Sequence, residues 1–177
     1  MGSKRLLVIT GAAVMALAVP AAAEEATAEI YAVSAEGIGE EIGTIRLTDS
    51  ADGLVIQTDL GDLPPGPHGF HLHTHGSCEP AQNDQGQMTA ALGAAGHYDP
   101  DNTGRHAGPE GDGHKGDLPV LEVAADGTAE VTLKAPRLTV ADARGRALMI
   151  HAGGDNYSDE PKPLGGGGAR IACGLVE

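Results

Sequence analysis

Short runs in which apolar and polar residues partly alternate account for much of the chain after residue 23. A period of two places successive side chains on opposite faces of an extended strand, so each run predicts a half-buried strand. The predicted strands are 27–35, 41–48, 54–60, 69–75, 119–124, 128–133, 147–152 and 169–176. The pairs Asp52-Gly53 and Asp126-Gly127 each separate two of these runs and predict hairpins. Since no stretch after residue 23 carries a helical period, the pattern predicts an all-β fold, an eight-stranded antiparallel sandwich or barrel.

Two long segments, 76–118 and 153–168, carry no such pattern and are rich in Gly and in polar residues. Loops of this length in a compact domain are usually either functional or disordered. The composition agrees with a turn-rich fold, because 27 Gly and 11 Pro stand against one Phe, three Tyr and no Trp.

The charge balance is strongly acidic. Eleven Lys and Arg face 25 Asp and Glu, a net charge of -14. Such a surface repels nucleic-acid backbones and anionic membranes, so we expect neither as a partner. The chain nevertheless contains eight His, a number that the charge does not explain.

The first 23 residues have the organisation of a secretory signal peptide. Lys4 and Arg5 precede the apolar run 6–19, and three alanines end at Ala23 before the expected cleavage point. The run is shorter than the roughly 20 residues that a spanning helix needs. We therefore predict a signal peptide at 1–23, a mature domain at 24–177, and export to an extracytoplasmic space, with no membrane attachment after cleavage.

That compartment affects the two cysteines. Cys78 and Cys173 are expected to form a disulfide in an oxidising space, and with only two cysteines the pairing is unique. The alternative is a pair of buried free thiols.

The histidines of two predicted strands share an outer face. If Phe70 and Leu72 enter the core, His71 and His73 point outward together, and the same parity turns His151 outward on its strand. A His-x-His pair alone is equally compatible with a solvated polar face. Three imidazoles from two strands, however, favour a metal site outside the barrel wall.

The long segment 76–118 supplies a second set of metal donors. His97, His106, His114 and Asp117 are three imidazoles and a carboxylate, the donor set of a tetrahedral structural zinc site. A Gly-rich loop with few apolar side chains has little to hold it besides a metal and a disulfide. We therefore expect loop order and metal binding to be one event.

Five motifs follow one another as they do in the copper/zinc superoxide dismutases. They are Gly69-Phe70-His71-Leu72-His73, Gly96-His97-Tyr98-Asp99-Pro100, His106-Ala107-Gly108-Pro109, His114-Lys115-Gly116-Asp117-Leu118-Pro119 and Ala169-Arg170-Ile171-Ala172-Cys173-Gly174. The resemblance spans 27–177, and the Gly-Ser-Cys after the histidine strand is similar to the bacterial periplasmic branch. It implies a Greek-key barrel whose two long loops form an external metal site.

The resemblance also implies a role for each residue of the site. Copper, cycling between Cu(II) and Cu(I), would be bound by His71, His73, His97 and His151, and Zn(II) by His97, His106, His114 and Asp117. His97 would bridge the two ions. The implied reaction converts two superoxide anions and protons into dioxygen and hydrogen peroxide.

Two further residues gain roles in the same way. Asp155 would accept hydrogen bonds from His71 and His106, and Arg170 would attract and orient superoxide beside the copper. A solvated loop carboxylate and a surface ion pair are the respective alternatives.

Other charged residues match the family less clearly. Lys162 is a weaker candidate for steering superoxide. The acidic residues Asp99, Asp101, Glu110 and Asp112 around the zinc loop depart from the family pattern and could slow anion entry. His68 is assigned to packing or hydrogen bonding and His75 to the surface.

Two other functions use similar residues. A non-catalytic periplasmic copper- and zinc-binding protein would share the ligands but would have no use for Arg170 or Asp155. A two-zinc hydrolase would need more carboxylates. The family includes dimers, so the resemblance allows a homodimer.

Overall fold

A computed structural model describes residues 23–177 of the chain. The predicted signal peptide, 1–23, lies outside the described residues apart from Ala23. None of the helices in this described part has the length and apolar character needed to cross a membrane.

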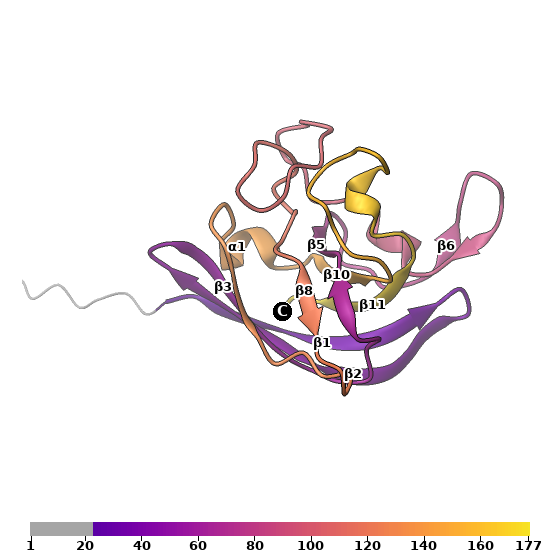
Figure 1. Ribbon diagram of the computed structural model, residues 1–177, viewed down its shortest axis with the longest axis horizontal. Helices are drawn as coiled ribbons and strands as arrows, with labels where there is room; N and C mark the ends of the chain where they lie inside the picture. The colour runs from indigo at the N-terminus through magenta and orange to yellow at the C-terminus, as the bar shows by residue number, and fades with distance from the viewer. Residues whose placement is uncertain (1–22) are drawn as a thin grey trace, which may run out of the picture.

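Most of the fold is one curled antiparallel sheet of seven strands (Figure 1). Their order is β5-β10-β11-β1-β2-β3-β9. The bounds are β1 (Glu25–Ser34), β2 (Gly37–Ser50), β3 (Gly53–Leu60), β5 (Phe70–His73), β9 (Thr132–Ala135), β10 (Ala147–His151) and β11 (Arg170–Leu175). Strands distant in sequence, such as β1 and β11, are therefore neighbours, and the metal-site candidates on β5 and β10 lie side by side.

A second, two-stranded sheet pairs β4 (Gly66–His68) with β8 (Leu121–Val123). The segment leading into β8 continues along the free edge of β5, because Leu72 N donates to Gly116 O at 2.9 Å and Leu118 N to Phe70 O at 3.3 Å. Each of the eight predicted strands has a counterpart in the structure, and β4 and β5 are separated only by Gly69. The all-β prediction is confirmed.

Apolar residues at alternate strand positions fill the concave side of the sheet. Leu54, Ile56 and Leu60 of β3 are buried, as are Phe70 and Leu72 of β5. Burial of each side chain of this size stabilises the fold by about 1.5–3 kcal/mol. The core therefore fixes which face of β5 looks outward.

One of the two predicted hairpins is confirmed and the other is wrong. Asp52 lies in the turn between β2 and β3, and Gly53, with a φ of 103°, begins β3 opposite Ser50. The Asp126-Gly127 pair does form a turn, with Gly127 N donating to Ala124 O at 3.0 Å. Its two arms, however, pair with different strands, β8 with β4 and β9 with β3. Each arm pairs with the edge of a different sheet rather than with the other arm, so the local turn signal did not predict the pairing.

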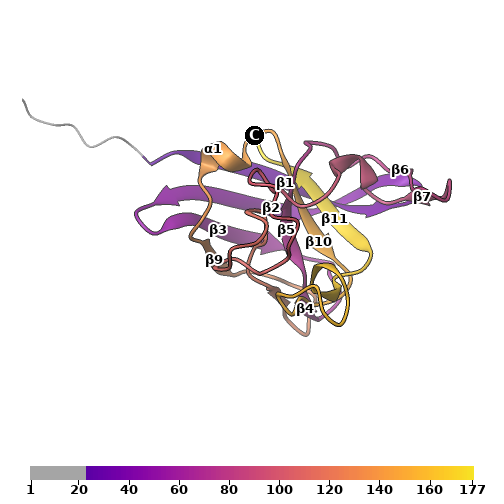
Figure 2. The same cartoon turned by 90° about the horizontal axis from the view of Figure 1, so that it is seen from above.

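The expectation of no helix is also corrected. One short helix, α1 (Val140–Ala143), begins at a capping box in which Thr139 and Asp142 exchange hydrogen bonds. Single helical turns η1 (Leu92–Ala94) and η2 (Leu164–Gly166) lie in the long loops. Figure 2 shows α1 at one end of the molecule and the small hairpin of β6 (Ala81–Gln82) and β7 (Met88–Thr89) at the other.

The predicted disulfide is confirmed. Cys78 and Cys173 are bonded, which ties the start of the long segment after β5 to β11. Around the bond, Ala91, Ala94 and Met149 form a second buried cluster on the outer side of the sheet. This loop segment is thereby packed directly beside the histidine face.

Candidate metal centre

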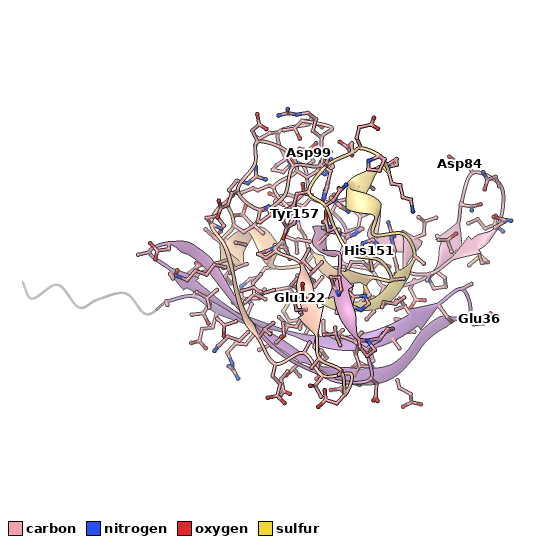
Figure 3. All side chains as sticks on the ribbon, in the orientation of Figure 1. Glu36, Asp84, Asp99, Glu122, His151 and Tyr157 are labelled. Atoms are coloured by element: carbon pink, nitrogen blue, oxygen red, sulfur yellow. A yellow bond between two sulfur atoms is a disulfide. The ribbon has the colours of Figure 1, made fainter. Side chains whose placement is uncertain are left out.

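The outer face of β5 and β10 carries three histidines. His71 and His73 alternate with Phe70 and Leu72, whose side chains belong to the barrel core, and His151 ends β10. All three imidazoles are nevertheless buried. The reason is that both long loops fold over this face, and Figure 3 shows His151 below the loops in the upper part of the view.

A fourth histidine, His97, reaches this face from the long segment between β7 and β8. Its backbone forms an isolated bridge with His73. Beside that bridge, Thr74 N donates to Gly96 O at 3.0 Å and Thr74 Oγ1 donates to His97 O at 3.2 Å. The end of β5 therefore fixes the backbone that presents His97.

Each of these four imidazoles has one buried ring nitrogen with no hydrogen-bond partner in the described part of the chain. The four atoms are His71 Nδ1, His73 Nε2, His97 Nε2 and His151 Nε2. The four residues form one group in which each offers a ligand nitrogen, and the four nitrogens lie within 4.8 Å of one another. A buried polar atom left without a partner costs about 1–3 kcal/mol, so four in one place indicate a ligand. Four imidazole nitrogens fit a metal ion.

In three of these rings the opposite nitrogen faces an oxygen outside both ligand clusters, and in the fourth, His97, it faces Asp117 Oδ1 of the cluster described next. Carboxylate and carbonyl oxygens only accept, so that nitrogen carries the proton and donates. This tautomer leaves the lone pair on the nitrogen that faces the cluster. The bonds are His71 Nε2 to Asp155 Oδ2 (2.8 Å), His73 Nδ1 to Ala95 O (2.8 Å) and His151 Nδ1 to Gly168 O (3.1 Å).

A second cluster surrounds the buried carboxylate of Asp117. Its Oδ1 lies 2.9 Å from His97 Nδ1, 3.0 Å from His106 Nδ1 and 3.3 Å from His114 Nδ1. A tetrahedral ion with bonds of about 2.0 Å separates its ligand atoms by about 3.3 Å. The His106 nitrogen makes no hydrogen bond at its distance, because the angle is unsuitable. The four atoms therefore fit a small tetrahedral ion, and His97 belongs to both clusters.

Asp155 joins the two clusters from the loop between β10 and β11. Its Oδ2 accepts from His71 at 2.8 Å and its Oδ1 from His106 at 2.7 Å. The backbone N–H of Tyr157 donates to Oδ1 at 2.7 Å. Gly165 lies so close that a Cβ there would collide with this carboxylate. One fully buried carboxylate thus orients a histidine of each cluster.

Burial keeps the histidines on the strands neutral. It lowers the pKa of His71 to about 3 and that of His151 to about 4, and it holds the pKa of His73 well below its usual value. Neutral imidazoles are the form that binds metal.

The histidine between the two carboxylates behaves in the opposite way. Burial opposes protonation of His106, but the two adjacent carboxylates, Asp117 and Asp155, outweigh it and raise its pKa to about 9. Burial likewise favours the neutral form of both carboxyls, yet the histidine N–H donors hold the pKa of Asp117 and of Asp155 well below the usual range. Without a metal, this cluster therefore retains a proton.

Arg170 lies opposite His151 in the ladder between β10 and β11. Its Nη1 donates to Ala91 O and its Nη2 to Ala95 O, both at 2.6 Å. Burial lowers the pKa of Arg170, but a guanidinium stays charged at neutral pH. Because Ala95 O also accepts from His73, this cation is fixed beside the first cluster.

The remaining candidates lie away from the two clusters. His68 is buried, with Nδ1 2.7 Å from His151 O and Nε2 2.7 Å from Pro64 O, as its assignment to hydrogen bonding predicts. His75 is exposed, also as predicted. Lys162 is exposed on the loop before η2. Asp99, one of the acidic residues expected around the zinc loop, accepts a hydrogen bond from the backbone N–H of Gly104 at 2.9 Å.

Sequence reasoning missed the backbone acceptors of the site. The carbonyls of Ala91, Ala95 and Gly168 hold Arg170 and two of the histidines, but every residue has a carbonyl and no sequence pattern marks these three. The positive φ of Ala91 (48°) and Ala95 (62°) turns this segment toward the site, and an alanine gives no signal of such a conformation.

Comparison with known proteins points to one family. Residues 41–176 match the family model described as copper/zinc superoxide dismutase (SODC). The Cu-Zn superoxide dismutase of Brucella abortus biovar 1 (strain 9-941) is 51% identical over 162 residues, 91% of this chain and 93% of that protein. That of Escherichia coli (strain K12) is 51% identical over 168 residues, 93% of this chain and 96% of that protein.

Solved structures agree. The Cu/Zn superoxide dismutase from Brucella abortus has a TM-score of 0.85 and 50% identity, covering 87% of this chain and 100% of that one. The monomeric copper, zinc superoxide dismutase from Salmonella enterica, solved in solution, has a TM-score of 0.78 and 52% identity, with coverages of 87% and 100%.

Proposed function

This chain belongs to the copper/zinc superoxide dismutase family, and we propose that its two histidine clusters are the copper and zinc sites. The reaction converts two superoxide anions and two protons into one dioxygen and one hydrogen peroxide. The observation that carries the assignment is the set of four buried, unpartnered imidazole nitrogens on β5, β10 and the adjoining loop.

We assign copper to the cluster made of imidazoles alone. Its ligands are His71, His73, His97 and His151. Imidazole suits copper, and the acceptors behind three of these rings keep each lone pair aimed at the ion. When bound, copper supplies the electron transfer, since it alternates between Cu(II) and Cu(I).

We assign zinc to the cluster around the carboxylate. Its ligands are His97, His106, His114 and Asp117. The distances around Asp117 Oδ1 support a tetrahedral site, and zinc has no redox chemistry, so its role is structural and electrostatic.

His97 belongs to both ligand sets, through Nδ1 on the zinc side and Nε2 on the copper side. An imidazole that binds two ions must lose both ring protons. Its Nε2 is therefore the atom of the chain at which a proton can be taken up and passed to the product.

Arg170 is the second catalytic residue in this proposal. Its guanidinium, held by two carbonyls, presents a fixed positive charge beside the copper ligands. On a chain with a net charge of -14, that charge makes a local target for an anion. It positions superoxide by hydrogen bonds and charge together.

We also propose that 1–23 is a signal peptide and that the mature domain, 24–177, works in the periplasm. The Cys78–Cys173 disulfide supports an oxidising compartment.

A homodimer stays a prediction from the family. Sedimentation of the mature chain distinguishes a dimer from a monomer.

Pulse radiolysis of the copper- and zinc-loaded chain tests the function. We expect superoxide to disappear far faster than in buffer, and a rate no faster than in buffer would contradict the proposal.

Metal analysis tests the ligands. His151→Ala should lose copper and keep zinc, His114→Ala should lose zinc first, and the control His75→Ala should keep both. The reverse pattern would overturn the assignment.

A further inference from the structure

Arg137 lies between β9 and α1, outside both ligand sets, yet its guanidinium reaches the loop that carries the proposed zinc ligands. Its Nη1 donates to Gly111 O and Gly113 O, and its Nη2 donates to Gly113 O and His114 O. The two bonds to Gly113 O measure 3.2 and 3.1 Å. The side chain is half-buried and its Nε is fully covered. The Arg137 guanidinium therefore binds three carbonyls at the C-terminal end of a single turn.

That turn, 107–113, connects two proposed zinc ligands, His106 and His114. It is closed at its base by a bond from His114 N to Arg105 O at 2.8 Å. It consists of small and polar residues. A Cβ at Gly111 would collide with Ala107 O, and one at Gly113 would collide with Arg105 O at the base of the turn. With so few apolar atoms to pack, its conformation depends on polar contacts.

A second contact joins the same two regions. Lys115 Nζ lies 2.7 Å from Asp142 Oδ1 of α1, and both side chains are largely buried. Arg137 and Asp142 thus hold the chain immediately before and immediately after His114.

We propose that Arg137 is a positioning residue that fixes His114 and thereby slows the loss of zinc. The inference rests on the proposed zinc ligands. An arginine suits this place because its rigid, planar fork spans several carbonyls at once, whereas a lysine ammonium is a single point. Partners that orient metal ligands typically contribute 10–100-fold to metal affinity.

The test measures zinc transfer from the copper-free, zinc-loaded full chain to a coloured chelator. Arg137→Ala should release zinc about tenfold faster or more, and Arg137→Lys should fall between it and the wild type. The matched control is Arg144→Ala. It removes an equal charge from the connection between β9 and β10, but the contact that is lost is the one to Glu25 O. Arg144→Ala should release zinc at the wild-type rate.

Co(II) bound in place of zinc reports the ligand geometry through its visible absorption. We expect Arg137→Ala to weaken and shift that band. A folded Arg137→Ala variant with wild-type zinc transfer and a wild-type band would overturn the inference. If that variant does not fold, Arg137→Lys decides by the same two measurements.

Dismutase activity of the wild type separates this inference from the proposed function. A wild-type chain that holds zinc without consuming superoxide would contradict the function and leave the role of Arg137 intact. An Arg137→Ala variant with unchanged zinc transfer would contradict the role of Arg137 alone.

Discussion

The two halves of the proposed metal centre are built on different kinds of backbone. His71, His73 and His151 project from β5 and β10, whose ladder pairs Met149 with His71 and Ala147 with His73. The backbone hydrogen bonds of the seven-stranded sheet therefore place these three rings. The proposed zinc ligands lie between 97 and 117, outside the named strands. Backbone bonds to β5 hold the two ends of this segment, at His97 and Asp117, whereas side chains hold the part that carries His106 and His114.

The difference teaches which part of the site is formed without metal. The strand histidines keep their positions because the apolar core beneath them fixes β5 and β10. His106 and His114 depend on Asp155, Arg137 and the proposed zinc ion, so we expect their order and metal binding to be coupled.

Zinc removal should produce the largest contrast. We expect the backbone amides of 99–115 to exchange hydrogen about 100-fold faster or more without zinc, because local opening of a loop costs little once its ligand set is empty. Amides of β5 and β10 should stay protected. Hydrogen exchange read by mass spectrometry measures both regions at once, and equal acceleration in the strands would show that the halves are not independent.

Asp155→Asn should weaken both sites about 10–100-fold, since the amide offers one acceptor oxygen where two histidine N–H groups need one each. The loss should be larger for zinc, because His106 stands on a loop whereas β5 still holds His71. Competition with chelators measures both affinities. Asp84→Asn, at the tip of the β6–β7 hairpin in Figure 3, is the control. A loss confined to copper would refute the expected asymmetry.

Arg170→Glu should slow superoxide consumption by about tenfold or more while leaving copper and zinc contents unchanged. Arg170 lies on the strand side, and in its proposed role it acts on the anion rather than on the metals. Its replacement by an acidic residue should also invert the dependence of the rate on ionic strength. Pulse radiolysis across a salt series provides the measurement, and a salt profile identical to the wild type would remove the steering role.

The metal-free chain should show a smaller effect of pH on stability, with opposite contributions from the two halves. The raised pKa of His106, about 9, contributes stability that is complete below about pH 6.5 and is lost as the pH rises through 9. The lowered pKa values of His71 and His151, about 3 and 4, act the other way. Below about pH 6.5 the unfolded chain takes up protons that the folded chain refuses, so stability falls toward pH 4.

The free energy of unfolding of the metal-free chain should therefore be greatest near pH 6.5. Urea unfolding between pH 4 and 10 gives this profile. His106→Gln should flatten only the alkaline limb. A wild-type stability that rises from pH 6.5 to 9 would contradict the raised pKa of His106, and one that does not fall from pH 6.5 to 4 would contradict the lowered pKa values of His71 and His151.

The strand half of the centre could be predicted from the sequence by elementary geometry. Alternation of Phe70 and Leu72 with His71 and His73 fixes which residues share the outer face, and the core then makes that face unique. The loop half needed the family resemblance, because residue types in 76–118 indicate zinc without giving a position for any ligand.

What the sequence could not predict involves backbone groups and distant pairing. Ala95 O serves both Arg170 and His73, and three carbonyls receive Arg137, yet nothing in the residue types distinguishes these carbonyls from others. The Asp126-Gly127 turn was correctly placed, but competition between two sheets decided its strand pairing. Long-range contacts of this kind are settled by the whole fold rather than by local pattern.

His97, the one residue shared by both halves, allows the most direct test. The visible spectrum of Cu(II) in the copper-loaded chain should be recorded before and after zinc is added. In the wild type, zinc should change the copper spectrum, because both ions bind the same imidazole. In His97→Ala, zinc should leave the copper spectrum unchanged. An equal response to zinc in both proteins would contradict a shared ligand.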